Sequence, residues 1–171
     1  YYRRGKAYFY IGDLEKACSD FEQIVKIDPT FQDAFHDLGI VYISLKRWDD
    51  AQETFQKQLN LKPDDTDAIY HIALIESEGR NDYMRAIGNL QKVLIADPEH
   101  LMARFHLALL YARNRYRHSE YRGEAINQLQ KLLEIYEEIP DFEDIHSAYF
   151  LLGGLYDDEP DDINLAIEAY E

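Results

Sequence analysis

Apolar side chains recur at spacings of three and four residues along most of this chain. In the most regular stretch, residues 35–63, the apolar and small residues at these spacings are Phe35, Leu38, Gly39, Tyr42, Ala51 and Phe55. The spacing predicts two amphipathic α-helices joined by a short turn, each with one face turned towards a core. The small residues among them would let the two helices approach closely.

The same double pattern recurs along the chain, and prolines separate its copies. Pro29, Pro63 and Pro98 stand 34 and 35 residues apart, and each disfavours helix at the residue before it. One extra residue falls in the turn 77–82 of the third copy and about five fall in the turn of the fourth. The predicted repeats are approximately 1–31, 32–65, 66–100, 101–145 and 146–171.

The regular stretch resembles the tetratricopeptide repeat (TPR) in both order and spacing. The family series of an aromatic residue, Leu-Gly, Tyr, Ala, Phe and Pro is matched here by Phe35, Leu38-Gly39, Tyr42, Ala51, Phe55 and Pro63. The resemblance implies an all-α fold, a TPR-like right-handed superhelical solenoid of about five helix-turn-helix repeats in a single domain over 1–171. Because the first repeat lacks its first positions and the fifth stops in its second helix, we expect a fragment that is incomplete at both ends.

Composition and charge narrow the classes of partner. With 46% hydrophobic residues among 171, the chain can bury a core and does not have a disordered composition. A formal charge of −15 argues against binding to a nucleic-acid backbone or an anionic membrane surface. No apolar run approaches the roughly 20 residues of a membrane-spanning helix. The single cysteine, Cys18, excludes an internal disulfide and favours an intracellular location.

In TPR proteins the first helices of the repeats line a groove that holds a peptide or helix of a partner, through the second, fifth, sixth and ninth positions of each repeat. By resemblance, the partner-binding residues of repeats two and three are Asp33, His36, Asp37, Asp67, Tyr70, His71 and Leu74. Those of repeat four are Met102, Phe105, His106 and Leu109, and those of repeat five are Phe150 with Ser147, Leu151 and Gly154. The alternative is that several of them only pack between neighbouring first helices.

One TPR subgroup grips the carboxylate end of chaperone tails with lysine, asparagine and arginine at these positions. Read from repeat one, three of the corresponding positions hold Asp37, Asp67 and His71. Carboxylates would repel an anionic tail. We therefore expect a protein or peptide partner other than an acidic chaperone tail.

Two patterns suggest metal binding, and both have a simpler interpretation. His36, His71 and His106 recur every 35 residues, but equivalent positions on packed helices stand about 8–10 Å apart, whereas zinc holds nitrogens at about 2.0–2.1 Å. The acidic turn 157–168 has the spacing of a calcium loop, yet Pro160 interrupts it and Asp162 stands where glycine is required. We expect no metal and no cofactor.

The turn of repeat four carries the opposite charge and forms a secondary basic patch. Its arginines are Arg113, Arg115, Arg117 and Arg122. Arginine mixed with tyrosine is typical of contact surfaces. The alternative is a first helix extended by one turn, with arginines favourable at its carboxyl end.

The sequence contains no glycine-rich phosphate loop, no nucleophile elbow and no H-E-x-x-H pair, and we interpret Cys18 as a structural thiol. We expect a non-catalytic protein–protein interaction scaffold that binds a peptide or helix of a partner in its concave groove. Two alternatives stay open: a substrate-recruiting arm of a larger multidomain enzyme, and a structural module that self-associates.

Overall fold

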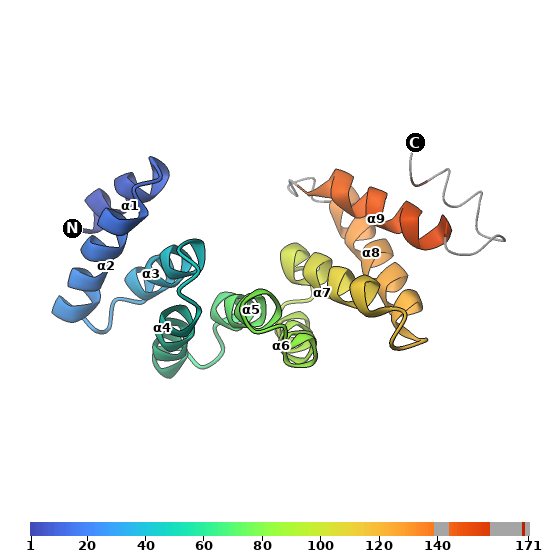
Figure 1. Cartoon of the computed structure of the whole chain (residues 1–171), viewed down its shortest axis with the longest axis horizontal. Coiled ribbons are helices and arrows are strands. Elements are labelled where there is room, and N and C mark those ends of the chain that lie inside the picture. The colour runs from blue at the N-terminus through green and yellow to red at the C-terminus, as the bar shows by residue number, and fades with distance from the viewer. Residues whose placement is uncertain (139–143, 158–168, 170–171) are drawn as a thin grey trace. The chain divides into compact units, whose positions relative to one another are not determined.

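The computed structural model describes residues 1–138, 144–157 and 169. Within these residues it contains nine α-helices, one π-helical turn and no strand (Figure 1), which confirms the all-α prediction. The chain divides into two compact units, Tyr1–Ala96 (unit one) and Asp97–Glu171 (unit two). The expectation of one continuous domain over 1–171 stays a prediction.

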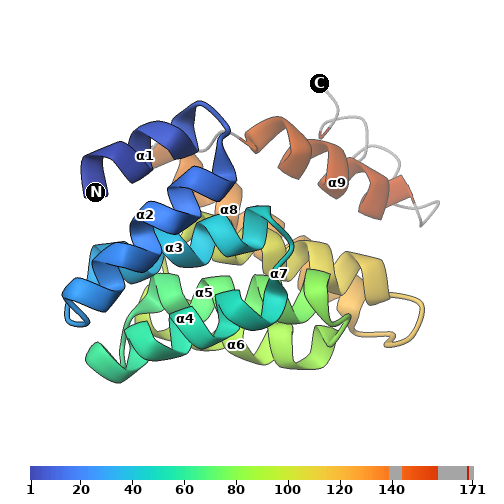
Figure 2. The same cartoon turned by 60° about the vertical axis from the view of Figure 1, so that its left-hand side comes forward.

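Unit one consists of three helix pairs, one in each of the first three predicted repeats. Its helices are α1 (Tyr2–Tyr10), α2 (Leu14–Ile27), α3 (Gln32–Ser44), α4 (Trp48–Leu61), α5 (Thr66–Leu74) and α6 (Tyr83–Ala96). Successive helices pack against each other as hairpins, α1 on α2, α3 on α4 and α5 on α6 (Figure 2).

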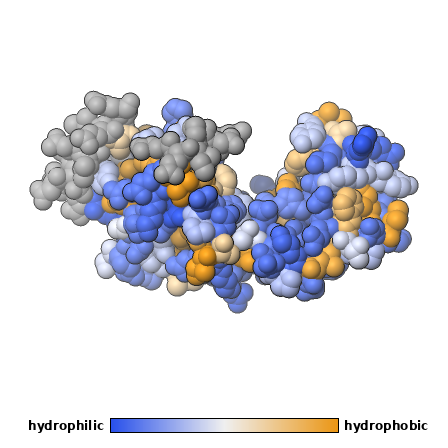
Figure 3. Space-filling view, turned by 180° about the vertical axis from the view of Figure 1, so that it is seen from behind, coloured by the Kyte–Doolittle hydropathy of each residue, from blue (hydrophilic) through white to orange (hydrophobic). Residues whose placement is uncertain are grey.

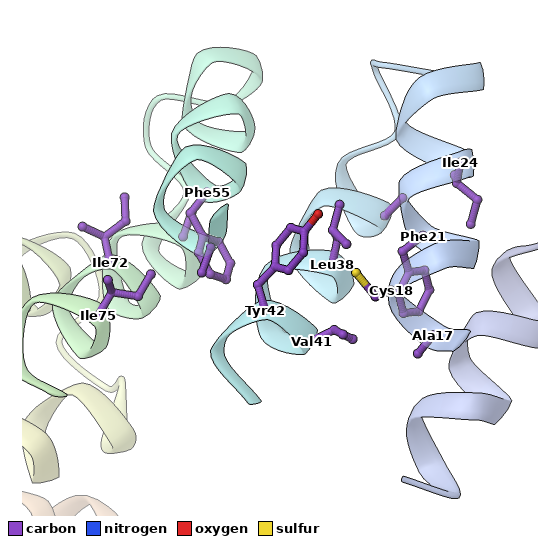
Figure 4. Packing of buried hydrophobic residues seen from close by; sticks show 13 residues of the cluster. Ala17, Cys18, Phe21, Ile24, Leu38, Val41, Tyr42, Phe55, Ile72 and Ile75 are labelled. Carbon is purple, nitrogen blue, oxygen red and sulfur yellow. The ribbon is translucent and has the colours of Figure 1, made fainter. Parts of the chain in front are cut away.

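The core of unit one includes the rings of Phe21 and Phe55 among its buried side chains (Figure 4). Phe21 of α2 and Phe55 of α4 occupy equivalent places and are 1% and 0% exposed. A Cβ atom at Gly5 would stand 2.9 Å from Cε1 of Phe21, and one at Gly39 would stand 2.6 Å from Cε2 of Phe55. Glycine is therefore required at both sites by the close approach of the ring.

The turns inside the helix pairs share one backbone feature. Gly12, Lys46 and Asn81 stand at equivalent places and have φ angles of 79°, 57° and 54°. This left-handed conformation suits glycine and is tolerated by asparagine, whereas a lysine adopts it with strain. The turn geometry is thus preserved although its sequence changes.

The extra residue of repeat three is absorbed by a helix end. The π-helical turn η1 (Ile75–Gly79) continues α5 and overlaps the start of the predicted turn 77–82. A single-residue insertion into a helix produces such a wider turn. It brings Gly79 against Trp48 of α4, because a Cβ at Gly79 would stand 2.7 Å from Cγ of the indole.

Unit two contains α7 (Leu101–Asn114), α8 (Tyr121–Glu138) and α9 (Ile145–Asp157). Helices α7 and α8 pack as a hairpin, and α9 packs against both of them. The largest fully buried side chains are Leu107, Leu129, Leu132 and Leu155. At 14 residues α7 is only one residue longer than α3, so the insertion of repeat four does not add a full turn to its first helix. The predicted second helix of repeat five falls on residues outside the described part of the chain.

No helix in the described ranges combines the length and the apolar character that crossing a bilayer requires.

The contact between Gly39 and Phe55 predicts opposite effects for two similar substitutions. Gly39→Ala should lower the free energy of unfolding by about 1–3 kcal/mol, because its methyl group would overlap the Phe55 ring. Gly88→Ala in α6, where nothing stands within 4 Å of the new Cβ, should raise it by roughly 0.5–1 kcal/mol. Urea unfolding followed by circular dichroism measures both, and a change of the same sign in the two variants would contradict the packing argument.

Candidate functional site

Two of the three histidines that recur every 35 residues meet in unit one. The ring centroids of His36 on α3 and His71 on α5 are 5.2 Å apart, closer than the 8–10 Å expected from helix spacing. His71 also stacks on Phe55, with centroids 4.9 Å apart and ring planes 14° apart. The two imidazoles therefore form an aromatic cluster over the Phe55 ring. No group of three metal-binding side chains is assembled within the described residues.

The acidic groove residues of unit one differ in their surroundings. Asp33 and Asp67 are exposed at the starts of α3 and α5. Asp37 is half-buried, and its Oδ2 lies 3.9 Å from Nζ of Lys6 on α1. Burial and a hydrogen bond to Asp37 raise the pKa of the Tyr2 hydroxyl. The basic and phenolic groups of α1 thus offset the charge of Asp37, and the two exposed carboxylates carry the acidic character of this face.

Two predicted groove aromatics are buried by their neighbours. Tyr70 is 7% exposed and Phe105 is 6% exposed, while Leu74 is half-buried. Packing between neighbouring first helices, the alternative to partner binding, therefore accounts for most of the surroundings of Tyr70.

Unit two holds a pocket of about 630 Å³ between α7 and α9, named here the α7–α9 pocket. Predicted groove residues make up most of its wall: Phe105, Leu109, Ser147, Phe150, Leu151 and Gly154. Gly154 contributes no side chain, so the space beside it stays open. Met102 and His106 are not among the lining residues, and Nδ1 of His106 lies 2.9 Å from the carbonyl oxygen of Met102 on the same helix.

Phe150 is the most exposed large apolar side chain of this wall, with 72% of its surface open to solvent. Exposed apolar residues elsewhere in the described chain, such as Tyr10 and Ile95, stand outside this pocket. On the face drawn in Figure 3, hydrophobic patches interrupt a mostly hydrophilic surface. Phe150 differs from these residues because its exposed ring lies at the edge of a pocket.

The arginines of the basic patch of repeat four differ in their contacts. Arg115 lines the α7–α9 pocket; its guanidinium donates to the Ala112 carbonyl and the Tyr116 hydroxyl, each at 2.8 Å. Nε of Arg122 instead donates to the carbonyl of Leu155 at 2.9 Å and ties α8 to α9. Arg113 and Arg117 are exposed. Only Arg115 therefore brings positive charge to the pocket.

A second pocket, of about 430 Å³, lies in unit one where α4, α5, η1 and α6 meet, and we name it the Glu76 pocket. The Glu76 side chain on its wall is only 6% exposed and accepts a hydrogen bond of 2.8 Å from Nδ2 of Asn89. The repeat pattern alone did not predict this site. The signal that could have found it is an acidic residue at a repeat position that holds tyrosine elsewhere.

Cys18 lies in the core of unit one and is 5% exposed. Its Sγ donates to Oε1 of Glu22 at 3.2 Å. Burial, helped by the hydrogen bond to Glu22, raises the pKa of the thiol to about 11. This environment suits a structural thiol and opposes formation of a nucleophilic thiolate.

Comparison with known proteins places these helix pairs in a family. Tetratricopeptide repeat family models match residues 11–74 and 78–116. The chain is 30% identical over 101 residues to Tetratricopeptide repeat protein 37 of Xenopus laevis, which covers 59% of this chain and 6% of that protein. The chain thus spans a small part of this relative's length.

Two solved structures have the same fold. MamA from Desulfovibrio magneticus RS-1 superposes with a TM-score of 0.76 at 22% identity, over 99% of this chain and 89% of that one. YrrB, described as a TPR protein with an unusual peptide-binding site, superposes with a TM-score of 0.69 at 17% identity, over 99% and 82%. At these identities the likeness concerns the fold alone.

The raised pKa of Cys18 predicts a slow thiol. At pH 8 the folded chain should react with iodoacetamide at least about tenfold more slowly than the denatured chain, because a free cysteine has a pKa of about 8.5 and Cys18 forms far less thiolate. Mass spectrometry of the alkylated protein gives both rates. Equal rates in buffer and in guanidinium chloride would show that the thiol is neither buried nor perturbed.

Proposed function

Because this chain belongs to the tetratricopeptide repeat family, we propose that it is a non-catalytic interaction module whose first helices hold a peptide or helix of a partner protein. The TPR fold supports protein–protein interaction scaffolds in general. The observation that carries the finer proposal is the α7–α9 pocket, which lies between two first helices and is lined mostly by predicted groove residues.

The chemistry of this pocket favours an amphipathic segment. Phe105, Leu109 and Phe150 offer apolar surface, which an aliphatic or aromatic side chain of the partner would cover. The Arg115 guanidinium at the wall would donate hydrogen bonds to a carboxylate or carbonyl oxygen next to that side chain. A bulky apolar anchor with an adjacent acceptor is therefore the motif that unit two should select.

Unit one favours a different side-chain chemistry. The exposed Asp33 and Asp67 would attract basic residues, and the net charge of −15 would speed the approach of a basic partner. The same carboxylates argue against an acidic chaperone tail as ligand. YrrB supports peptide binding on this fold only to the extent that its description states it.

The two alternatives from the sequence predict other results. A recruiting arm of a multidomain enzyme would bind peptides in the same way, and the rest of the gene would show the catalytic domain. A self-associating module would show a mass that rises with concentration, and reversing the charge of Arg115 and Arg117 should abolish that rise if these residues form the contact.

A peptide library displayed on phage tests the groove. Peptides selected on the wild-type chain should bind Phe150→Ala at least about tenfold more weakly, because the variant removes the exposed ring at the pocket edge. Tyr10→Ala is the matched control, since Tyr10 is an equally exposed aromatic residue, 78% against 72%, outside the pocket. Isothermal titration calorimetry measures the affinities and circular dichroism checks the fold.

Selected peptides that bind wild type, Phe150→Ala and Tyr10→Ala with the same affinity would contradict binding in the α7–α9 pocket. A loss in both variants would indicate an unspecific effect of removing surface aromatics.

A further inference from the structure

Glu76 stands at a position that holds tyrosine in every other repeat. The equivalent residues are Tyr8, Tyr42, Tyr111 and Tyr156. Glutamate is almost never fully buried unless it is paired, yet Glu76 is 6% exposed. A buried carboxylate at a tyrosine position needs an explanation beyond helix packing.

In repeats two and five the tyrosine reaches the second helix of the preceding pair. The Tyr42 hydroxyl donates to Oε1 of Glu22 on α2 at 2.7 Å. Nε2 of Gln130 on α8 donates to the Tyr156 hydroxyl at 2.9 Å. The phenol therefore fills the space between a first helix and the second helix before it.

Glu76 leaves this space open. The residue of α4 that is equivalent to Glu22 is Gln56, and it lines the Glu76 pocket together with Gln52. The carboxylate of Glu76 turns to α6, where Oε2 accepts from Asn89 at 2.8 Å. The result is a pocket of about 430 Å³ in place of a ring.

The pocket holds one buried acceptor that lacks a donor within the described residues, beside a carboxylate that has one donor. Oε1 of Gln52 is buried without a hydrogen-bond donor among the residues that the structure describes. Among the described residues, the Glu76 carboxylate accepts its hydrogen bond from Asn89. Leu59, Pro63 and Ile72 form apolar walls beside these oxygens. A ligand with an apolar stem and a donor tip fits this arrangement.

Repeat four shows which donor fits such a space. Arg104 of α7 is 7% exposed. Its Nη1 donates to Oε1 of Gln128 at 2.9 Å, and its Nη2 donates to the carbonyl of Pro98. The chain thus places a guanidinium between a side-chain amide of the second helix and the proline that opens the repeat.

The same place in repeat three is empty. The equivalents of Gln128 and Pro98 are Asn89 and Pro63, and both line the Glu76 pocket. Ile69 stands where repeat four has its arginine, so no guanidinium of this repeat enters. Repeat three adds a carboxylate to that space and omits the cation.

We propose that the Glu76 pocket binds the guanidinium of an arginine side chain supplied by a partner protein. A planar guanidinium can give paired hydrogen bonds to the Glu76 carboxylate and a further bond to Gln52. A partner cation also offsets the cost of the buried charge. The site lies on α4, α5, η1 and α6 of unit one, so it is separate from the α7–α9 pocket and stands or falls independently of the proposed groove.

Lys92 on the pocket rim is compatible with a cationic ligand. Its Nζ donates to Oδ1 of Asn89 at 3.1 Å, which orients the amide so that Nδ2 faces Glu76. Lys92 is exposed, so solvent and salt screen its charge from the pocket. It therefore positions Asn89 more than it repels the ligand.

Titration of the ¹⁵N-labelled chain with N-acetyl-L-arginine N-methylamide tests the proposal by NMR. We expect the backbone and side-chain amide signals of Gln52, Gln56 and Asn89 to shift. The uncharged isostere N-acetyl-L-citrulline N-methylamide should bind at least about tenfold more weakly, because it lacks the charge-assisted bonds. Absent shifts at these residues, or equal affinity for the two compounds, would overturn the assignment.

Variants separate the role of Glu76 from general acidity. Glu76→Gln should weaken binding of the arginine compound by about tenfold or more. Glu78→Gln is the matched control, since Glu78 is an exposed carboxylate of the same π-helical turn, and it should leave binding unchanged. Equal losses in both variants would show unspecific electrostatic attraction and overturn the proposal.

Two further variants keep the test valid if Glu76→Gln loses its fold. Ile69→Arg should fill the pocket from within, as Arg104 does in repeat four, and Glu76→Tyr should fill it as the other repeats do. Both should abolish the NMR shifts and raise the melting temperature. If free L-arginine binds more tightly than the blocked compound, the ligand is a small molecule, and the assignment to a protein partner is wrong.

Discussion

The packing of an aromatic ring from a second helix against a glycine of the first helix governs the first two helix pairs of this structure. Phe55 is fully buried because Gly39 has no side chain to hold it away, and the close approach that results fixes the distance between α3 and α4. The same ring also contacts the next pair, since His71 of α5 stacks on it. The Phe55 ring thus sets the distance between α3 and α4 and also provides a surface on which α5 packs.

The two pockets arise at other positions, where the repeats differ from one another. Where tyrosine becomes Glu76, a space opens on the side of the second helices. On the first helices of unit two, Gly154 stands beside Phe150 and leaves the α7–α9 pocket unfilled. Pockets in this chain therefore open at positions where one repeat departs from the pattern of the others.

Sequence spacing placed several of the predicted groove residues on one helix face, but it did not predict the surroundings of each side chain. Phe105, Leu109 and Phe150 line one pocket as a set, because their repeat positions lie on one helix face. The environment of each was not predictable, since it depends on neighbours far away in sequence. Arg122 is the clearest example: it belongs to a charged turn in sequence, but it holds the carbonyl of Leu155 across 33 residues.

By itself the sequence determined the helices, their pairing and the repeat period, because apolar spacing, small residues and prolines act locally and recur. Tertiary structure decided which side chains meet between the helices and where a pocket stays open. It brought His36 within 5.2 Å of His71, where helix spacing alone predicted 8–10 Å, since side chains reach across the gap. It also enclosed Glu76 in a pocket, because the volume of a cavity depends on the size of all the side chains around it.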